Sequence, residues 1–557
     1  MRFLPGTLAL LLALLIAWPI DVAQAKPRKK RRRPPSSPPP TLVVPEEPAL
    51  PPAPEASAEA EPQDADIVET IDMGDTGDTG DTGTSPTPAP PPSTPPWERF
   101  QFRGWAKVGL SLGGSKLGID SPTDPLAVRR EWWTNQEQLF LRLRVERERM
   151  FEAVVAGTMT HGVYIAESRP QEVEERRSSF SATLLEAHAG WFWQKLDLRV
   201  GLQRIAWGKG DAFAPNDILN PWDQRDPVFL ETETSRLPVF AIRADIALGR
   251  ASLEGLVLPF FRPNRFDVYG SNWALIQDDA PILFRSLFGL VDRVVDRSLR
   301  DELMPVVMQV ERPRDDFSDT SAAARLRWRA GDFDFSHYLH YGFDDRPLYS
   351  IDPQAAAALS TVDFSALKAA DLAPLLLLID QGKKPISGRY LRRIHVGADA
   401  ETTFGSLVLR FDGAFTSRHV FARRQDFTGE THGALQAVLA VEHQPGDMGK
   451  LFLVEASYLR LLDHEDSKHL LGFRRDNLAL AALWQWTFLR ERLELEARGT
   501  VSVRPFAFVA RPEIGWKWKE TAVSVRLGAL LLGGEEGTTP HYFRKNRSVY
   551  VHARYAF

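Results

Sequence analysis

The chain has 557 residues and a formal net charge of -5, but its composition changes near residue 96. The first 96 residues carry 8 Lys and Arg and 13 Asp and Glu, which leaves the remaining 461 residues with 60 of each. A formally neutral body offers no cationic face for nucleic acid, so we expect no nucleic-acid partner. The absence of cysteine excludes disulfides, thiolate metal sites, a cysteine nucleophile and a lipoprotein anchor.

The N-terminus has the features of a secretion signal. Arg2 precedes an apolar run from Leu8 to Pro19, and Ala23-Gln24-Ala25 has the small-x-small pattern of a cleavage site. The run is shorter than the roughly 20 residues that a membrane-spanning helix needs. We therefore predict a signal peptide at residues 1–25 and an exported mature protein.

Residues 26–96 have the composition of a tail rather than a domain. They hold 19 of the 41 prolines, and seven of the eight residues from Lys26 to Arg33 are basic. Such a segment cannot bury enough apolar area to fold, so we predict a disordered, proline-rich tail in the periplasm. Residues 26–33 could contact the cell wall or anionic lipid, although a solvated linker explains them as well.

Residues 97–557 alternate between apolar and polar side chains with a period of two. Apolar residues or glycine occupy every second position from Phe100 to Leu112, and the pattern recurs at 139–145 and 493–501. This period indicates half-buried strands, and runs of 10–13 residues are long enough to cross a bilayer at a tilt. About 18 such strands are predicted, and they begin near residues 100, 135, 150, 181, 196, 237, 251, 321, 332, 391, 406, 433, 450, 476, 491, 507, 520 and 547.

The predicted connections alternate in length, as they do in outer-membrane barrels. Tight turns are expected at 249–250, 331–332, 403–405 and 519–520, and long loops at 113–134, 163–180, 207–236, 261–320 and 343–390. With the tight turns in the periplasm, aromatic residues such as Trp191, Trp484 and Trp516 fall at the periplasmic ends of strands. An aromatic girdle is expected at that boundary.

The C-terminus favours one cellular location. Apolar residues occupy every second position from Val549 through Tyr555 to Phe557, which resembles the assembly signal of Gram-negative outer-membrane barrels. We predict an all-β fold: a single transmembrane antiparallel β-barrel of about 18 strands at residues 97–557, integral to the outer membrane of a Gram-negative bacterium. Its expected partners are outer-membrane lipid, lipopolysaccharide and the barrel-assembly machinery.

The positions expected to face the lumen carry both charges in similar number. A channel selective for one ion would favour one sign, so we expect a passive pore with weak ion preference, or a paired wall that stiffens the barrel. The predicted pore-lining residues are Arg142, Arg144, Arg243, Asp245, Arg325, Arg327, Arg329, Arg410, Asp412, Arg492, Glu494 and Arg498.

The segment at 207–223 is rich in Gly, Pro, Asn and Asp, which indicates a dense series of turns. Folded into the lumen, it would narrow the pore. The predicted constriction residues are Trp207, Lys209, Asp211, Asn216, Asp217, Asn220 and Asp223. The three aspartates could ligate calcium, but turn chemistry explains them, so no metal and no cofactor are expected.

The same region carries a family resemblance. Gly201-Leu202-Gln203-Arg204, Trp207-Gly208, Asn220-Pro221 with Asp223, and Leu237-Pro238 resemble the GRQ…WG…NP.D…P element of a proteobacterial family of outer-membrane barrels of unknown function; Leu202 replaces the arginine of that element. The Asp-x-Phe-x-Pro-x-Asp core from Asp211 to Asp217 is similar to alginate-export-type porins, which have 18 strands. The resemblance implies passive transport of an unidentified small solute.

Two predicted loops have helical character, at 281–304 and 355–379. Their apolar faces could pack as a cap, or they could form the entrance of a carrier for hydrophobic compounds. A structural barrel without transport is the third alternative. No nucleophile elbow, zinc histidine pair or phosphate loop is present, so we expect no enzyme.

Overall fold

The computed structural model describes residues 100–557 except 115–129, 148–149, 169–172, 227, 229–231, 269–270, 278–279, 282–283, 285–307, 361–372, 447–448 and 466–468. The signal peptide, the tail at 26–96 and most of the predicted helix at 281–304 lie outside the described residues. What the sequence predicts for those segments stays a prediction.

Eighteen strands form one sheet. Their bounds are β1 Phe100–Gly113, β2 Arg130–Arg147, β3 Phe151–Ser168, β4 Val173–Phe192, β5 Leu196–Gln203, β6 Val239–Ala247, β7 Ala251–Leu258, β9 Ser321–Ala330, β10 Phe333–Phe343, β13 Arg392–Phe404, β14 Leu407–Ala422, β15 Gly429–His443, β16 Lys450–Leu461, β17 Asp476–Phe488, β18 Leu493–Arg504, β19 Ala507–Trp518, β20 Val523–Gly534 and β21 Ser548–Ala556.

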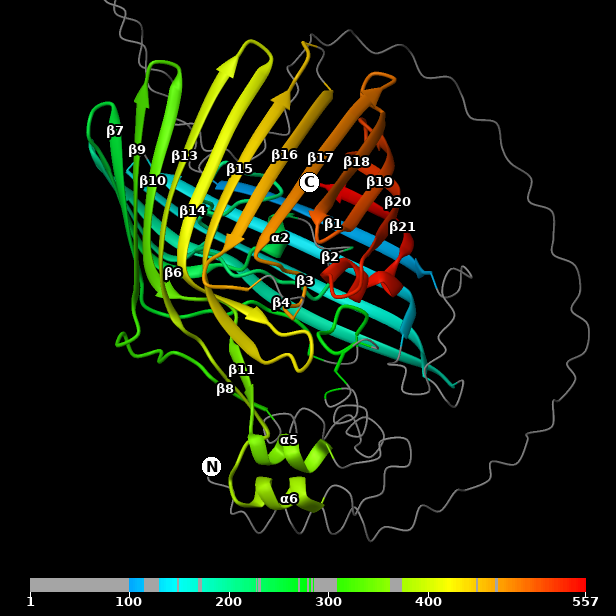
Figure 1. The fold of residues 1–557 in the computed structure, drawn as a ribbon. Helices are drawn as coiled ribbons and strands as arrows, with labels where there is room; N and C mark the ends of the chain where they lie inside the picture. The colour runs from blue at the N-terminus through cyan, green and yellow to red at the C-terminus, as the bar shows by residue number, and fades with distance from the viewer. Residues whose placement is uncertain are drawn as a thin grey trace, which may run out of the picture. The chain divides into compact units, whose positions relative to one another are not determined.

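The sheet closes on itself. Each strand pairs antiparallel with the next barrel strand along the chain, and β21 pairs antiparallel with β1, as the ring of arrows in Figure 1 shows. Closure leaves no sheet edge, so every strand can satisfy its backbone groups with its neighbours in lipid. The predicted fold class and strand number are confirmed.

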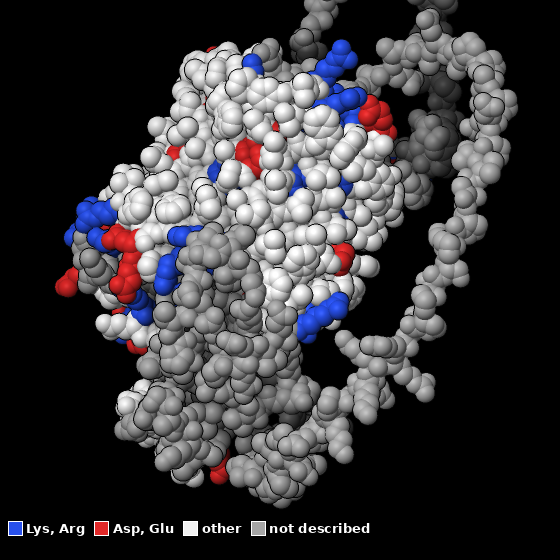
Figure 2. Space-filling view, turned by 90° about the vertical axis from the view of Figure 1, so that its right-hand side faces the viewer, with Lys and Arg blue, Asp and Glu red and all other residues white. Residues whose placement is uncertain are grey.

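The two faces of the wall differ as the alternation predicts. On β16, Val454 is 52% exposed whereas the adjacent Glu455 is 0% exposed. On β13, the exposed Ile394 and Val396 flank the buried His395. The outer face is therefore apolar and the inner face polar. Figure 2 shows that charged side chains are sparse on the wall facing the viewer and gather toward its margins.

Short turns lie at one end of the barrel, which we call the short-turn end. They include residues 248–250, 331–332, 405–406 and 519–522. Aromatic residues lie beside these turns: Trp328 stacks on Phe335 with ring centroids 4.5 Å apart, and Trp486 stacks on Phe488 at 4.7 Å. Outer-membrane barrels place such turns in the periplasm.

The opposite, long-loop end differs from the prediction most at one connection. The predicted loop at 163–180 is wrong, because β3 continues to Ser168 and β4 begins at Val173. The two strands stay paired over this stretch, with Tyr164 opposite Arg177. A hairpin can project beyond the membrane while its backbone remains bonded, so the charged residues at 174–177 did not mark a loop.

The remaining elements lie in the long connections. They are β8 Met308–Glu311, β11 Leu348–Ile351, β12 Ile386–Arg389, α2 Thr232–Ser235, α5 Pro353–Ser360, α6 Ala373–Asp380, α7 Thr539–Tyr542 and the 3-10 helix η3 Arg544–Asn546. β8, β12 and β11 form a small second sheet, and α5 lies beside α6 beyond the barrel rim (Figure 1). Among the described residues, no helix has the length and apolar character needed to cross a membrane.

Apolar loop side chains pack together at this end. Ala355 of α5 and Leu378 of α6 are buried in one cluster with Phe284, Phe427 and Tyr542. This part of the predicted apolar helices at 355–379 therefore packs as a cap.

The seam between the first and last strands depends on the C-terminal residue. The amide of Phe557 donates to the carbonyl of Gly104 at 2.9 Å, and the amide of Gly104 donates to the carbonyl of Phe557 at 2.8 Å. A Cβ on Gly104 would lie 2.7 Å from the Phe557 ring, so only glycine leaves room for that ring. The ring also contacts Phe102, with centroids 6.0 Å apart.

We expect Phe557→Asp to impair barrel assembly. The carboxylate would lie beside Phe102 near the membrane boundary, which costs up to about 1 kcal/mol, and the aromatic packing at the seam would be lost. The measurement is the fraction of membrane-extracted protein that migrates as a compact barrel in unheated gel electrophoresis. Phe317→Asp, which changes an exposed loop residue away from the seam, is the control. Equal compact fractions in the Phe557→Asp variant and in wild type would contradict this role.

Candidate functional site in the barrel lumen

The inner wall is a network of ion pairs across adjacent strands. Glu254 of β7 is 0% exposed and accepts Arg325 Nε of β9 at 2.9 Å, while Arg243 Nε of β6 lies 3.3 Å from its other oxygen. The three side chains meet because β6, β7 and β9 are neighbours on one face of the wall. A buried carboxylate needs such partners, because an unpaired charge there would be strongly destabilising.

A second network joins β18, β19, β20 and β21. Arg526 lies 3.0 Å from Glu494, 3.5 Å from Glu496 and 3.4 Å from Glu513. Glu513 also accepts the hydroxyl of Tyr550 at 2.6 Å. The predicted pore-lining residue Glu494 is thus part of the inner wall, in contact with two cations, because Lys517 also lies 3.1 Å from it.

Three arginines at alternate positions of β9, Arg325, Arg327 and Arg329, form what we call the cationic stripe, and each has an acidic partner. Arg325 pairs with Glu254 as described, Arg327 pairs with Asp245 of β6, and Arg329 pairs with Asp334 of β10 at 2.7 Å. Arg329 is largely exposed near the short-turn end. The stripe therefore offers no continuous row of free cations along the lumen.

Two further predicted residues, Arg142 and Arg144, lie on β2, on a different sector of the wall from β9. Arg142 Nε lies 3.3 Å from Glu186, and Arg144 Nη2 lies 2.8 Å from Glu152. The structure does not bring them to the stripe of β9. Each sector of the wall balances its own charges.

Two predicted residues of β18 and its preceding turn differ in position. Arg498 lies on the inner wall with its Nε 3.2 Å from Glu496. Arg492 lies in the turn between β17 and β18, where it pairs with Glu520 of the neighbouring turn at 2.7 Å. Arg492 is thus part of the short-turn end rather than of the strand wall.

The connection between β5 and β6 spans residues 204–238, and its described residues fold into the lumen; we call this connection the lumen loop. Figure 1 shows its helix α2 within the ring of strands. Trp207 is buried on the wall, where its Nε1 donates to Glu254 at 3.3 Å and its ring lies 5.2 Å from that of Tyr338 on β10. The loop therefore begins its path against β7 and β10.

The lumen loop then reaches β16, well around the ring. The backbone amides of Asp211, Ala212 and Phe213 all donate to the carboxylate of Glu455, at 2.5, 2.9 and 2.9 Å. Three converging amides form a nest that holds an anion without a cationic side chain. This contact fixes the tip of the loop to the far wall.

Between these anchors the loop contacts β13 and β14. The backbone amide of Lys209 donates to Asp412 at 3.2 Å, and the side-chain Nζ of Lys209 lies 3.5 Å from Glu401. Asp211 pairs with Arg410 at 3.2 Å. The predicted residues Arg410 and Asp412 thus line the wall beneath the loop, and both contact it directly.

Asn216 seats the loop on β13 and β14. Its side-chain amide donates to Asp412, and its Oδ1 lies 2.9 Å from Nε2 of His395. A Cβ on Gly397 would lie 1.7 Å from Oδ1 of Asn216, so glycine is required for this close approach. The fit between loop and wall is therefore specific to these residues.

The base of the loop is held by Asn220. Its Oδ1 accepts the amide of Ile205 at 2.7 Å and its Nδ2 donates to the carbonyl of Leu237 at 2.7 Å. One side chain thereby ties together the chain leaving β5 and the chain returning to β6. Asn220 of the Asn220-Pro221 pair therefore joins the two ends of the loop.

The three loop aspartates do not converge. Asp211 pairs with Arg410, Asp217 lies 2.6 Å from Arg236, and Asp223 lies 2.7 Å from Arg225. Among the described residues, these carboxylates have separate arginine partners and form no shared cation site. Turn and ion-pair chemistry accounts for them.

A polar cavity of about 260 Å³ lies in the long-loop half of the barrel. Its walls are the inner faces of β1 to β4 and the loop segments around Asp226 and Asn272. Gln136 of β2 donates to Asp226 at 3.2 Å, and Gln138 donates to Gln136 at 2.7 Å. The lining offers amides, hydroxyls and paired charges to a hydrophilic solute.

Several residues that carry this arrangement were not among the predicted site residues. Glu254, Tyr338, His395 and Glu455 are buried and polar, and each contacts the lumen loop. Each lies at an inward-facing position of its strand. The period-two alternation was the sequence feature that could have identified these residues. The alternation gives the face but not the partner, because the partners are far away in sequence.

The comparisons with known proteins place the chain in a family. A model for proteins of unknown function, DUF1302, matches residues 134–491. The chain belongs to this family. No curated protein sequence matches the chain. The resemblance to alginate-export-type porins stays a prediction.

Solved structures with a similar fold are distant in sequence. OccAB3 of Acinetobacter baumannii is 9% identical, with 82% of this chain and 99% of that chain covered and a TM-score of 0.41. OccK7 (OpdD) of Pseudomonas aeruginosa is 10% identical, with 82% and 98% covered and a TM-score of 0.40. OmpF of Salmonella typhi, in complex with daunomycin, is 10% identical, with 82% and 97% covered and a TM-score of 0.36.

Asp217 gives the lumen loop a dependence on pH. Burial raises the pKa of this carboxyl from 3.8 to about 6, even though the guanidinium of Arg236 lowers it. The folded protein therefore binds the proton more tightly than the unfolded chain does. The charge on Asp217 costs stability above about pH 6, and that cost disappears as the pH falls toward 4.

We expect wild type to gain stability relative to Asp217→Asn as the pH falls from 7 to 4, by up to about 3 kcal/mol. The measurement is the thermal midpoint of both proteins in detergent at several pH values. Asp315→Asn, a change at an exposed loop carboxylate, is the control for general charge effects. A difference between wild type and Asp217→Asn that stays constant or shrinks on acidification would contradict the raised pKa.

Proposed function

We propose that the protein is an outer-membrane channel for passive diffusion of a small hydrophilic solute, with the lumen loop as its constriction. The observation that carries the proposal is the contact between Glu455 and three consecutive loop amides, at 2.5–2.9 Å. A barrel that served only as a scaffold would need no loop fixed to its far wall. The polar inner face supports a hydrophilic rather than an apolar solute.

The cavity beside β1 to β4 is the proposed position of the solute. The part of the loop from Trp207 to Asn216 contacts β7, β10, β13, β14 and β16, which leaves the cavity on another sector of the wall. Its lining of amides and hydroxyls can replace the water hydrogen bonds of a small polar molecule. The solute would pass between the strand lining and the part of the lumen loop around Asp226.

The alternative of a carrier for hydrophobic compounds has less support. Leu287, Val291 and Val294, on which that hypothesis rests, lie outside the described residues. The described apolar residues of α5 and α6 are partly engaged in the loop cluster around Phe427. We therefore base the experiments on the lumen loop.

We expect Glu455→Ala to increase single-channel conductance in planar lipid bilayers. The change removes the acceptor of three loop amides, which weakens the seating of the loop by about 2 kcal/mol and lowers the population of the seated loop roughly thirtyfold. Glu496→Ala is the matched control, because Glu496 is also on the inner wall but pairs with Arg498 and Arg526. Unchanged conductance in an assembled Glu455→Ala barrel would place the constriction elsewhere.

We also expect weak ion selectivity. The wall charges are paired sector by sector, so neither sign dominates the field along the lumen. The measurement is the reversal potential of wild type in a KCl gradient, and we expect a value close to zero. A potential near the Nernst limit for K⁺ or Cl⁻ would show that an unbalanced ring of charge controls permeation. Absence of any conductance, in wild type and in Glu455→Ala alike, would favour a structural barrel.

A further inference from the structure

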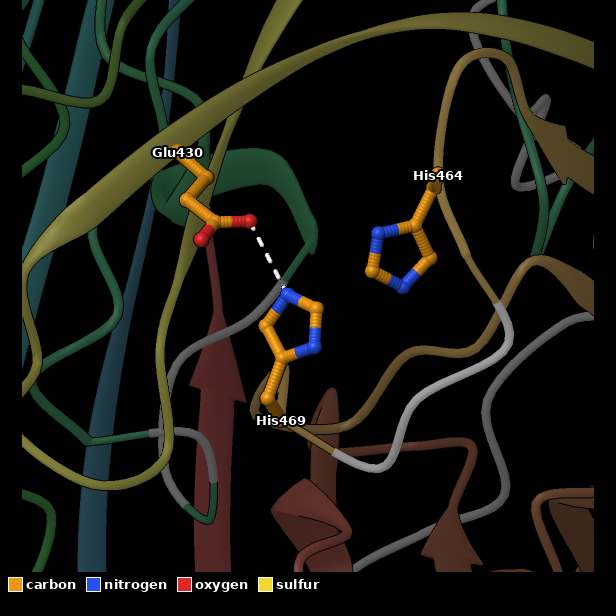
Figure 3. Close-up of side chains that lie close together, drawn as sticks. All are labelled: Glu430, His464 and His469. Atoms are coloured by element: carbon orange, nitrogen blue, oxygen red, sulfur yellow. Dashed lines mark hydrogen bonds and ion pairs between the residues drawn. The ribbon is translucent and has the colours of Figure 1, made fainter.

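Three histidines and one glutamate gather at the long-loop end, away from the lumen loop. Glu430 and His432 are near the start of β15 and share its inward face, while His464 and His469 belong to the connection between β16 and β17. Figure 3 shows Glu430, His464 and His469 converging from separate segments. From the sequence we predict no metal, and these four residues are not among the predicted site residues; His432 and His464 are 32 positions apart in the chain.

The backbone around this cluster is fixed by hydrogen bonds. The amide of Leu462 donates to the carbonyl of Gly433 at 2.7 Å, next to His432, and the amide of Arg424 donates to the carbonyl of His469 at 2.6 Å. Beneath the cluster, Phe421 and Leu461 are part of a buried apolar group. The four side chains are therefore presented by anchored segments.

Nitrogen and oxygen atoms of these side chains lie close together. Oε2 of Glu430 lies 3.0 Å from Nε2 of His469 and 3.3 Å from Nε2 of His432. The His464 ring centroid lies 4.7 Å from that of His432 and 4.8 Å from that of His469. A carboxylate oxygen of Glu430, a ring nitrogen of His464 and a ring nitrogen of His469 all lie within 4.8 Å of one another.

Imidazole nitrogen and carboxylate oxygen are the ligands that Zn²⁺ prefers when no thiolate is present. A tetrahedral ion with bonds of about 2 Å holds its ligand atoms roughly 3.3 Å apart, so modest side-chain rotations would close the cluster. The other oxygen of Glu430 pairs with Arg423, which orients the carboxylate as outer partners do in metal sites. His464 is 5% exposed and the side chain of His469 is 31% exposed, so the site is sheltered and still accessible.

We propose that Glu430, His432, His464 and His469 bind one divalent transition-metal ion of the Zn²⁺ class. The ion would join the start of β15 to the connection between β16 and β17. This site does not depend on the proposed channel function, because its four residues belong to the start of β15 and to the connection between β16 and β17, and not to the lumen loop.

The experiment measures Zn²⁺ binding to untagged, detergent-solubilised full-length protein at pH 7.5, in competition with a chromogenic chelator. We expect one bound Zn²⁺ per chain, and at least about a tenfold loss of affinity in a His464→Ala, His469→Ala double variant. His161→Ala is the matched control, because His161 pairs with Glu137 at 2.7 Å on β3 and β2, away from the cluster. That variant should bind Zn²⁺ as wild type does.

Two further measurements distinguish Zn²⁺ binding at this site from nonspecific binding elsewhere on the protein. Co²⁺ added to wild type should give the visible absorption of a low-symmetry site, and the double variant should lack it. Zn²⁺ affinity should fall between pH 7.5 and pH 5.5, because protons compete for the imidazoles. Gel mobility without heating verifies that each variant is an assembled barrel. Wild type that binds no Zn²⁺, or an assembled double variant that binds it equally well, would overturn the proposal.

Discussion

The requirement that every backbone amide and carbonyl be satisfied inside lipid is the constraint on which the rest of the structure depends. It forces the strands to pair with both neighbours and the last strand to pair with the first. Phe557 and Gly104 complete that ring with two reciprocal backbone bonds. Once the ring is closed, successive side chains must alternate between lipid and lumen.

The alternation has an electrostatic consequence for the lumen. Each inward position is in a confined space where an unpaired charge is expensive, so the wall assembles as local groups such as Glu254 with Arg243 and Arg325. The buried Glu455 is held differently from these acids. Its partners are three backbone amides of the lumen loop rather than an arginine of the next strand. The wall thereby includes an acceptor whose geometry fits the loop.

The loops follow the same principle at the two ends of the barrel. Short turns need only satisfy a few backbone groups at the membrane boundary, and their neighbouring aromatics suit that boundary. At the other end, the connections are long enough to build clusters of their own, one apolar around Phe427 and one of histidines around Glu430. The lumen loop is the connection whose polar side chains find partners inside the ring.

The sequence by itself determined the fold class and the number of strands, because period-two alternation is a local property. It erred at 163–180, where a loop is predicted although the backbones of β3 and β4 stay paired. Only the tertiary structure decided the partners: Asp211 lies 244 positions before Glu455, and His469 lies 39 positions after Glu430. Such contacts depend on how the closed ring and its connections are placed in space, and alternation along one strand carries no information about that placement.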